Sequence, residues 1–169
     1  MMAPTHTMLG VATLLAGSSL RPDLLPASAV TIAAAALGSL APDIDHPSSW
    51  IGRRLRVVSI PLVGLVGHRG VTHSLLAAVG ASVGLFFLLK LGQDLAWAVA
   101  FLLGYLSHLA GDWLSGGVPL LWPSPRRFRA PVAIQTGGII EKLFALGFGS
   151  LVLYWAWHVV SAGQIGRLL

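Results

Sequence analysis

The chain contains no cysteine and few charged residues. The missing cysteine excludes disulfide bonds and thiolate metal sites. Charged residues make up only 10% of the sequence, against about 25% in an ordinary soluble domain. Hydrophobic residues make up 55%, and the mean hydropathy is +0.78. This composition argues against a typical soluble domain and indicates a membrane protein.

Two further absences concern the organisation of the chain. No lysine or arginine precedes Arg21, so the basic start of a signal peptide is missing. No linker or low-complexity tract divides the 169 residues. We therefore expect one membrane-embedded domain over residues 1–169.

Basic residues are concentrated in two polar segments. Residues 42–73 and 113–138 contain seven of the eleven Lys and Arg residues: Arg53, Arg54, Arg56, Arg69, Arg126, Arg127 and Arg129. Neither group is interleaved with the aromatic residues of a single-strand nucleic-acid binder, and both flank apolar runs. The positive-inside rule then places this side of the protein in the cytoplasm. We expect a cell inner membrane location and no nucleic-acid partner.

The apolar runs predict an all-α, multi-pass membrane bundle with about five long helices. The runs cover residues 7–20, 27–41, 74–89, 95–110 and 143–162. About 20 apolar residues are needed to cross a bilayer, and the last run has that length without help from flanking residues. Short polar turns join the first run to the second and the third to the fourth, which predicts two helical hairpins.

Histidine and aspartate residues lie at the open ends of both predicted hairpins. The residues are His6, Asp43, Asp45, His68, His73, His108 and Asp112. Partners at matched distances from a turn return to the same depth, because each helical residue rises about 1.5 Å. We therefore expect one cluster at the arginine-rich end.

The stretch GYLSHLAGDW, residues 104–113, is the most informative part of this pattern. His108 and Asp112 are four residues apart and so share one face of a helix. Such a pair can be hydrogen bonded, relay a proton or bind metal. Ionisable groups at membrane depth tend to be functional. Converging nitrogen and oxygen donors without thiols favour Zn²⁺, with Mn²⁺ or Fe as alternatives.

Four motifs give the chain a family resemblance. THTMLG, LAPDIDH, GHRGVTHSLL and SHLAGDWLSGGVPLLWP occur in this order over residues 5–123. Together they resemble the YdjM-like family of membrane-bound metal-dependent hydrolases. That family is distantly similar to zinc-dependent phospholipase C and P1-type nucleases, which are all-helical enzymes that cleave phosphate esters. The run at 143–162 would be an additional C-terminal transmembrane helix.

The resemblance implies a metal-dependent hydrolase acting on a phosphate ester. The helical pair His108 and Asp112 would bind metal, as would His6. Either Asp43 or Asp45 would be a ligand, with the other orienting a histidine or acting as a base. A second helical His-x-x-x-Asp pair is missing from the sequence, so we expect one or two zinc ions rather than three. Arg69 would bind phosphate, although it could equally be one of the positive charges that set the orientation of the protein in the membrane.

A site at headgroup level suggests a membrane lipid partner and an amphiphilic phosphate-containing substrate, such as a phospholipid or a polyprenyl phosphate. Two other classes use similar clusters. A transporter or proton-coupled carrier would hold histidine and aspartate nearer the bilayer midplane. A non-catalytic membrane adaptor would close the coordination sphere of its metal with protein ligands. The position of the cluster at the ends of the runs favours the enzyme.

Overall fold

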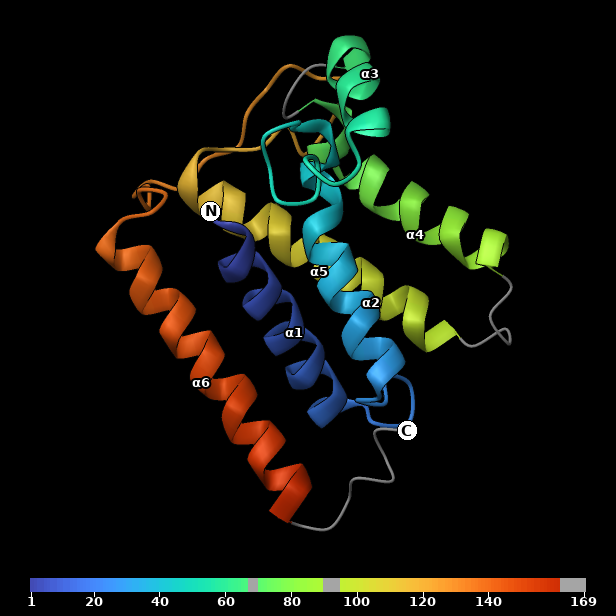
Figure 1. Cartoon of the computed structure of the whole chain (residues 1–169), viewed down its shortest axis with the longest axis vertical. Coiled ribbons are helices and arrows are strands. Elements are labelled where there is room, and N and C mark those ends of the chain that lie inside the picture. Colours follow the sequence, from blue (N-terminus) through green and yellow to red (C-terminus); the bar gives the residue numbers. More distant parts are fainter. Residues whose placement is uncertain (67–69, 90–94, 162–169) are drawn as a thin grey trace.

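The computed structural model describes residues 1–66, 70–89 and 95–161, and its regular structure is helical (Figure 1). These ranges contain six α-helices: α1 (Ala3–Leu20), α2 (Ala29–Leu40), α3 (Arg56–Val66), α4 (Leu75–Leu89), α5 (Leu95–Ser115) and α6 (Ile139–Ser161). Two short 3₁₀ helices, η1 (Ala41–Asp45) and η2 (Val71–His73), follow α2 and precede α4. The prediction of an all-α fold is confirmed for these residues.

The prediction of about five long apolar helices is not confirmed. Within the described ranges, only α5 and α6 are both long and apolar enough to cross a membrane by length and composition. α2 has 12 residues, because it begins after Ser28, which caps it, and gives way to η1 just before Pro42. α4 has 15 residues. These helices are shorter than the about 20 residues that a span requires.

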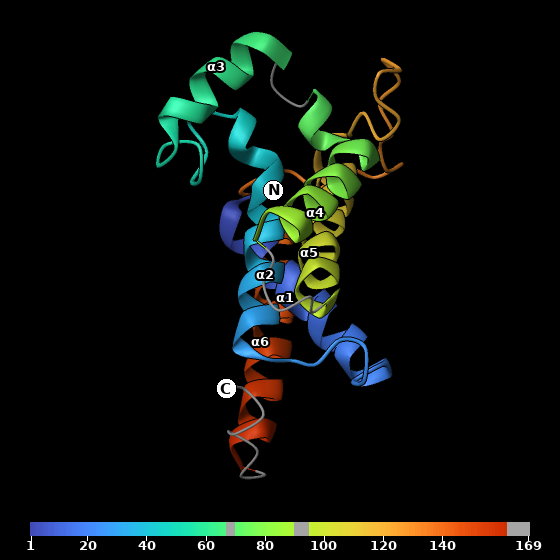
Figure 2. The same cartoon turned by 90° about the vertical axis from the view of Figure 1, so that its right-hand side faces the viewer.

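The predicted pairing of helices is confirmed. α1 packs against α2, α4 packs against α5, and the contact between α2 and α5 is the most extensive in the bundle. Figures 1 and 2 show that η1, α3 and the segment after α5 all lie at one end of the molecule. The two arginine-bearing segments therefore flank the same end, as expected from the hairpins.

Glycines allow α2 and α5 to approach backbone to backbone. A Cβ atom added to Gly104 would lie 2.0 Å from the carbonyl oxygen of Ala35, and one added to Gly38 would lie 2.1 Å from that of Phe101. Small residues at a helix interface are the usual means of close packing in membranes. Gly104 precedes His108 by about one turn, so this contact sets the depth of His108 against α2.

α6 packs along α1, and most of its side chains are exposed. Its first turn is fixed by the buried carboxylate of Glu141. One oxygen accepts the backbone N–H of Met2 at 2.5 Å, and the other accepts that of Gly137 at 2.6 Å. One side chain thus satisfies amide groups at the starts of both α1 and α6, which holds α6 to the end of α1 that carries His6.

Replacing Gly104 with alanine should destabilise the protein by roughly 1–3 kcal/mol, because the new methyl group collides with a backbone oxygen that cannot rotate away. The midpoint of thermal unfolding in detergent would measure this loss. Gly84→Ala on α4 is the matched control, since its Cβ would meet nothing within 4 Å. Equal midpoints for the two variants would contradict the proposed close contact.

Candidate metal centre

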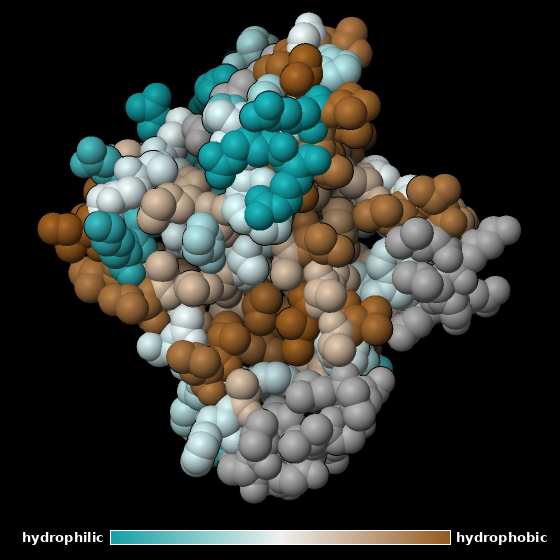
Figure 3. All heavy atoms as spheres, in the orientation of Figure 1, coloured by the Kyte–Doolittle hydropathy of each residue, from teal (hydrophilic) through white to brown (hydrophobic). Residues whose placement is uncertain are grey.

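A buried polar cluster lies where α1, η1, η2 and α5 meet. It contains His6 from α1, Asp43 and Asp45 from η1, Thr72 and His73 from η2, and His108 and Asp112 from α5. Asp43 has 18% of its side chain exposed, whereas the His and Asp side chains beside it are at most 2% exposed. Figure 3 shows hydrophilic residues gathered over this end of the face in view.

Two histidine nitrogens each lie at similar distances from the same two carboxylate oxygens. His73 Nε2 lies 3.8 Å from Asp43 Oδ1 and 3.6 Å from Asp112 Oδ2. His108 Nε2 lies 3.7 Å and 3.9 Å from the same two oxygens. These distances are too long for hydrogen bonds. They are close to the about 3.3–3.6 Å that separates two ligands of a tetrahedral zinc ion with bonds of 2.0–2.2 Å.

The protonation of His108 is fixed by the backbone of α2. Its Nδ1 lies 2.7 Å from the carbonyl oxygen of Ser39. A carbonyl can only accept, so Nδ1 carries the proton, and in the neutral ring Nε2 presents a lone pair. Nε2 is buried and has no hydrogen-bond partner among the described residues. The lone pair therefore faces the acceptor oxygens of Asp43 and Asp112, an arrangement that a cation between them would stabilise.

His73 is oriented by a second buried network. The Thr72 hydroxyl donates to Asp45 Oδ2 and lies 3.1 Å from His73 Nδ1. Asp45 Oδ2 is itself 3.5 Å from His73 Nδ1. These acceptors favour a proton on Nδ1, which leaves Nε2 to face Asp43 and Asp112. The Tyr105 hydroxyl donates to the carbonyl of Thr72 and so fixes η2 against α5.

Asp45, predicted as a metal ligand or as a base, lies apart from the converging donors. It contacts the Nδ1 side of His73, while the converging donors lie on the Nε2 side. The two groups of possible metal-binding donors found among the described residues do not include it. The reason is local: in η1, Asp43 and Asp45 are two residues apart and point to different sides of the short helix. Asp45 is placed to orient a histidine, one of the two roles that the sequence left open.

His6 belongs to a second group of donors with His108 and Asp112, all within 4.8 Å of one another. The rings of His6 and His108 stack at 3.8 Å with an interplanar angle of 14°. His6 Nε2 lies 3.3 Å from Asp112 Oδ1, to which the amine of Met1 also donates at 2.9 Å. Asp112 Oδ1 therefore faces His6 and the Met1 amine, while Asp112 Oδ2 faces His73 and His108.

The predicted site residues therefore fall into three sets. His6, Asp43, His73, His108 and Asp112 converge. Asp45 contacts the Nδ1 side of His73. His68 and Arg69 lie outside the described residues. Burial raises the pKa of the Asp43 carboxyl above its ordinary value.

Sequence reasoning missed several residues that position the site. The Ser39 carbonyl and the Tyr105 hydroxyl carry no motif of their own. Gly111 could have been noticed because it lies between His108 and Asp112: a Cβ there would come within 3.0 Å of the His6 ring. Thr72 could also have been noticed, since Thr precedes His at both Thr5–His6 and Thr72–His73.

Comparison with known proteins matches residues 1–165 to the family described as YdjM inner membrane protein. The chain belongs to the YdjM family. This confirms the resemblance to the YdjM family, while the likeness to zinc-dependent phospholipase C and P1-type nucleases stays a prediction. The names of the YdjM relatives support a location in the inner membrane.

Two relatives illustrate the range of similarity. The chain is 43% identical to the inner membrane protein YdjM of Escherichia coli (strain K12) over 123 residues, which cover 68% of this chain and 61% of the relative. The chain is 34% identical to "Uncharacterized protein YvsG" of Bacillus subtilis (strain 168) over 151 residues, 87% of this chain and 89% of the relative. The match therefore spans less than two thirds of the YdjM protein. No solved structure matches the chain.

Metal binding to the purified protein tests the cluster directly. His108→Ala should remove most of the bound metal, because His108 belongs to both donor groups. Asp45→Asn should weaken affinity by about 10–100-fold, as expected when the partner of a metal-binding histidine is lost. Affinity would be measured by titration of the chelator-stripped protein with Zn²⁺.

His46→Ala is the control for these variants. It neighbours Asp45 in sequence, but its ring contacts Ser48, 3.2 Å away, outside the cluster. Its zinc affinity should equal that of the unmodified protein. Unchanged affinity in His108→Ala would show that the metal, if any, binds elsewhere.

Proposed function

We propose that this chain is a metal-dependent hydrolase of the inner membrane that cleaves a phosphate ester in an amphiphilic substrate, such as a phospholipid or a polyprenyl phosphate. The observation that carries the proposal is the buried lone pair of His108 Nε2. It faces carboxylate oxygens of Asp43 and Asp112 and has no hydrogen-bond partner among the described residues. Such a group is costly to bury unless it has a partner, and a metal ion would be that partner.

Four residues would hold the first ion: Asp43, His73, His108 and Asp112. The donor set of imidazoles and carboxylates fits Zn²⁺ and is compatible with Mn²⁺ or Fe. His6 and the second oxygen of Asp112 would offer a place for another ion, which would displace the Met1 amine from that oxygen. Bound zinc would supply Lewis-acid activation of water and of a phosphoryl oxygen.

The protein's own groups would orient the ligands and admit the substrate. The Ser39 carbonyl holds His108, and the Thr72 and Asp45 pair holds His73. Asp43, with 18% of its side chain exposed, marks the edge from which a substrate could reach the cluster. Arg69 remains a candidate for phosphate binding on the sequence pattern alone.

We further propose a multi-pass topology with the site on the cytoplasmic face. The argument is electrostatic: the stretch from η1 to α3 and the segment after α5 lie together at the end with the cluster, and they carry six of the nine arginines. Cytoplasmic segments are enriched in Lys and Arg.

A second candidate is a membrane adaptor in which the metal is only structural. Four protein donors could by themselves complete a tetrahedral sphere, as in structural zinc sites. The position of His6 beside Asp112 favours the enzyme instead, because it extends the donor set beyond the four atoms of a closed site.

A lipid hydrolysis assay tests the proposal. The protein in detergent is loaded with zinc or manganese and given phosphatidic acid or phosphatidylglycerol. Chelation should abolish turnover. His108→Ala and Asp112→Ala should each reduce it by about 10²-fold or more, and the double variant should lose little further, because the two residues act as one unit.

His158→Ala is the matched control, since His158 is exposed on α6 and packs on Tyr154 rather than in the cluster. It should keep full activity. Turnover that survives both chelation and the two cluster substitutions would overturn the metal-dependent hydrolase. A folded, metal-loaded protein without turnover on either lipid would favour the adaptor.

A further inference from the structure

An apolar groove of about 630 Å³ runs between α1 and α2, and its lining includes no residue of α5. Its lining includes Ala3, Pro4 and Met8 from α1, Ala36 and Leu37 from α2, and Trp50 from the segment after η1. Alanines at the contact leave the groove open, because their methyl groups are too small to fill it. Figure 3 shows mainly apolar surface over α1 and α2 below the hydrophilic end.

One end of this groove adjoins the metal centre. Leu40 lines the groove and is the residue before η1. Ala3 also lines the groove, three residues before His6 in α1. The Ser49 hydroxyl donates to the Asp43 carbonyl at 2.8 Å and holds the adjoining Trp50 against this end. The groove therefore leads toward the most exposed donor of the cluster.

A positive charge marks the same end. The Arg54 guanidinium lies 3.7 Å from the centroid of the Trp50 ring and donates to the Trp50 carbonyl at 2.9 Å. The arginine is thus held in place by stacking and a hydrogen bond rather than extending freely. Apolar walls that end at a fixed guanidinium match a molecule with a hydrocarbon chain and an anionic head.

We propose that this groove binds the hydrocarbon chain of an anionic, phosphate-bearing lipid, whose headgroup lies between Arg54 and the exposed edge of Asp43. This inference rests on the proposed function and specifies its substrate as a lipid held by its chain.

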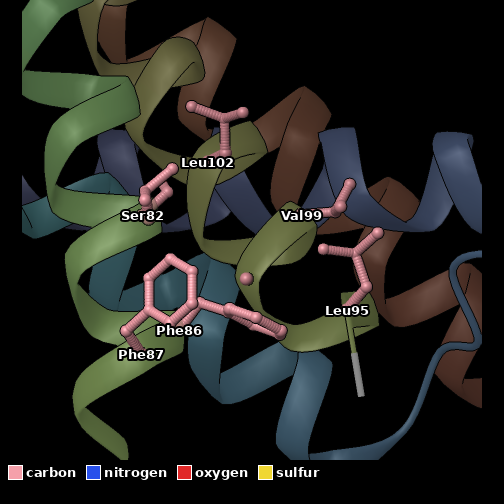
Figure 4. Close-up of a pocket in the computed structure, with 8 residues that line it drawn as sticks. Ser82, Phe86, Phe87, Leu95, Val99 and Leu102 are labelled. Carbon is pink, nitrogen blue, oxygen red and sulfur yellow. The ribbon is translucent and has the colours of Figure 1, made fainter. Parts of the chain in front are cut away.

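Another apolar cavity makes a useful contrast. About 170 Å³ lies between α4 and α5, lined by apolar side chains and Ser82 (Figure 4). It adjoins Leu95 at the start of α5, whereas His108 and Asp112 lie near the other end of that helix. Its lining residues do not include Trp50, whose ring carries the stacked guanidinium of Arg54 at the end of the groove.

Photo-crosslinking would test the groove without requiring turnover. The probe is a phosphatidic acid that carries a diazirine at the end of one acyl chain, added to the full-length protein in detergent. Peptide mapping should find the crosslinks on α1 and α2, around Met8 and Ala36. Unlabelled dioleoyl phosphatidic acid should compete, and phosphatidylcholine with the same chains should compete about tenfold less well.

Two variants separate the chain site from the headgroup site. Ala36→Phe should fill the groove and reduce crosslinking several-fold while zinc content stays unchanged. Ala29→Phe, the same change on the same helix outside this groove, should have no effect. Arg54→Gln, at an exposed position, should leave crosslinking in place but lower the preference for phosphatidic acid over phosphatidylcholine several-fold.

Equal competition by the two lipids would overturn the proposal, as would crosslinks spread over the exposed faces of α4 and α6. Unchanged crosslinking in metal-loaded Ala36→Phe would also overturn it. Headgroup-dependent crosslinking in a protein that never hydrolyses lipid would support the groove and reject the hydrolase. Metal-dependent hydrolysis without crosslinks in the groove would support the hydrolase and reject the groove.

Discussion

The hydrogen bond from His108 Nδ1 to the Ser39 carbonyl determines what the buried cluster can do. It fixes the proton on one ring nitrogen and leaves the other as a lone pair. The bond exists because α2 and α5 approach closely enough for a side chain of one helix to reach the backbone of the other. Gly38 and Gly104 permit that approach, since a methyl group at either position would collide with a backbone oxygen. Helix packing and site chemistry therefore depend on the same contact.

The rest of the cluster concentrates acceptors around that lone pair. Carboxylate oxygens of Asp43 and Asp112 lie 3.7 and 3.9 Å away, and His73 is held by Thr72 and Asp45 so that its own Nε2 faces the same oxygens. Buried carboxylates are costly to desolvate unless they are paired. One oxygen of Asp112 is paired with the Met1 amine, and a divalent cation would neutralise Asp43 and bind the other Asp112 oxygen together with the His108 lone pair. This electrostatic requirement supports a metal site more strongly than the presence of histidine and aspartate alone.

Sequence reasoning predicted the convergence because it depends on helix length and chain direction. Equal numbers of residues on both sides of a turn return the chain to the same depth, which brought His6, Asp43 and His73 to the end that holds His108. Sequence reasoning did not distinguish the role of Asp43 from that of Asp45, because the directions of the two side chains depend on the 3₁₀ turn of η1. It also overestimated the spans, because it counted as long helices runs that are shorter than a bilayer span; α2, within the run 27–41, has only 12 residues and ends just before Pro42.

X-ray absorption at the zinc edge, on protein purified without chelators, tests the central claim most directly. The account predicts stoichiometric zinc with nitrogen and oxygen ligands at about 2.0–2.2 Å and outer-shell scattering from at least two imidazole rings. The imidazole signal should decrease in His73→Ala, a change that removes a donor but leaves the contact between α2 and α5 intact. Protein that is folded but contains no stoichiometric metal, or a metal without imidazole ligands, would contradict the account.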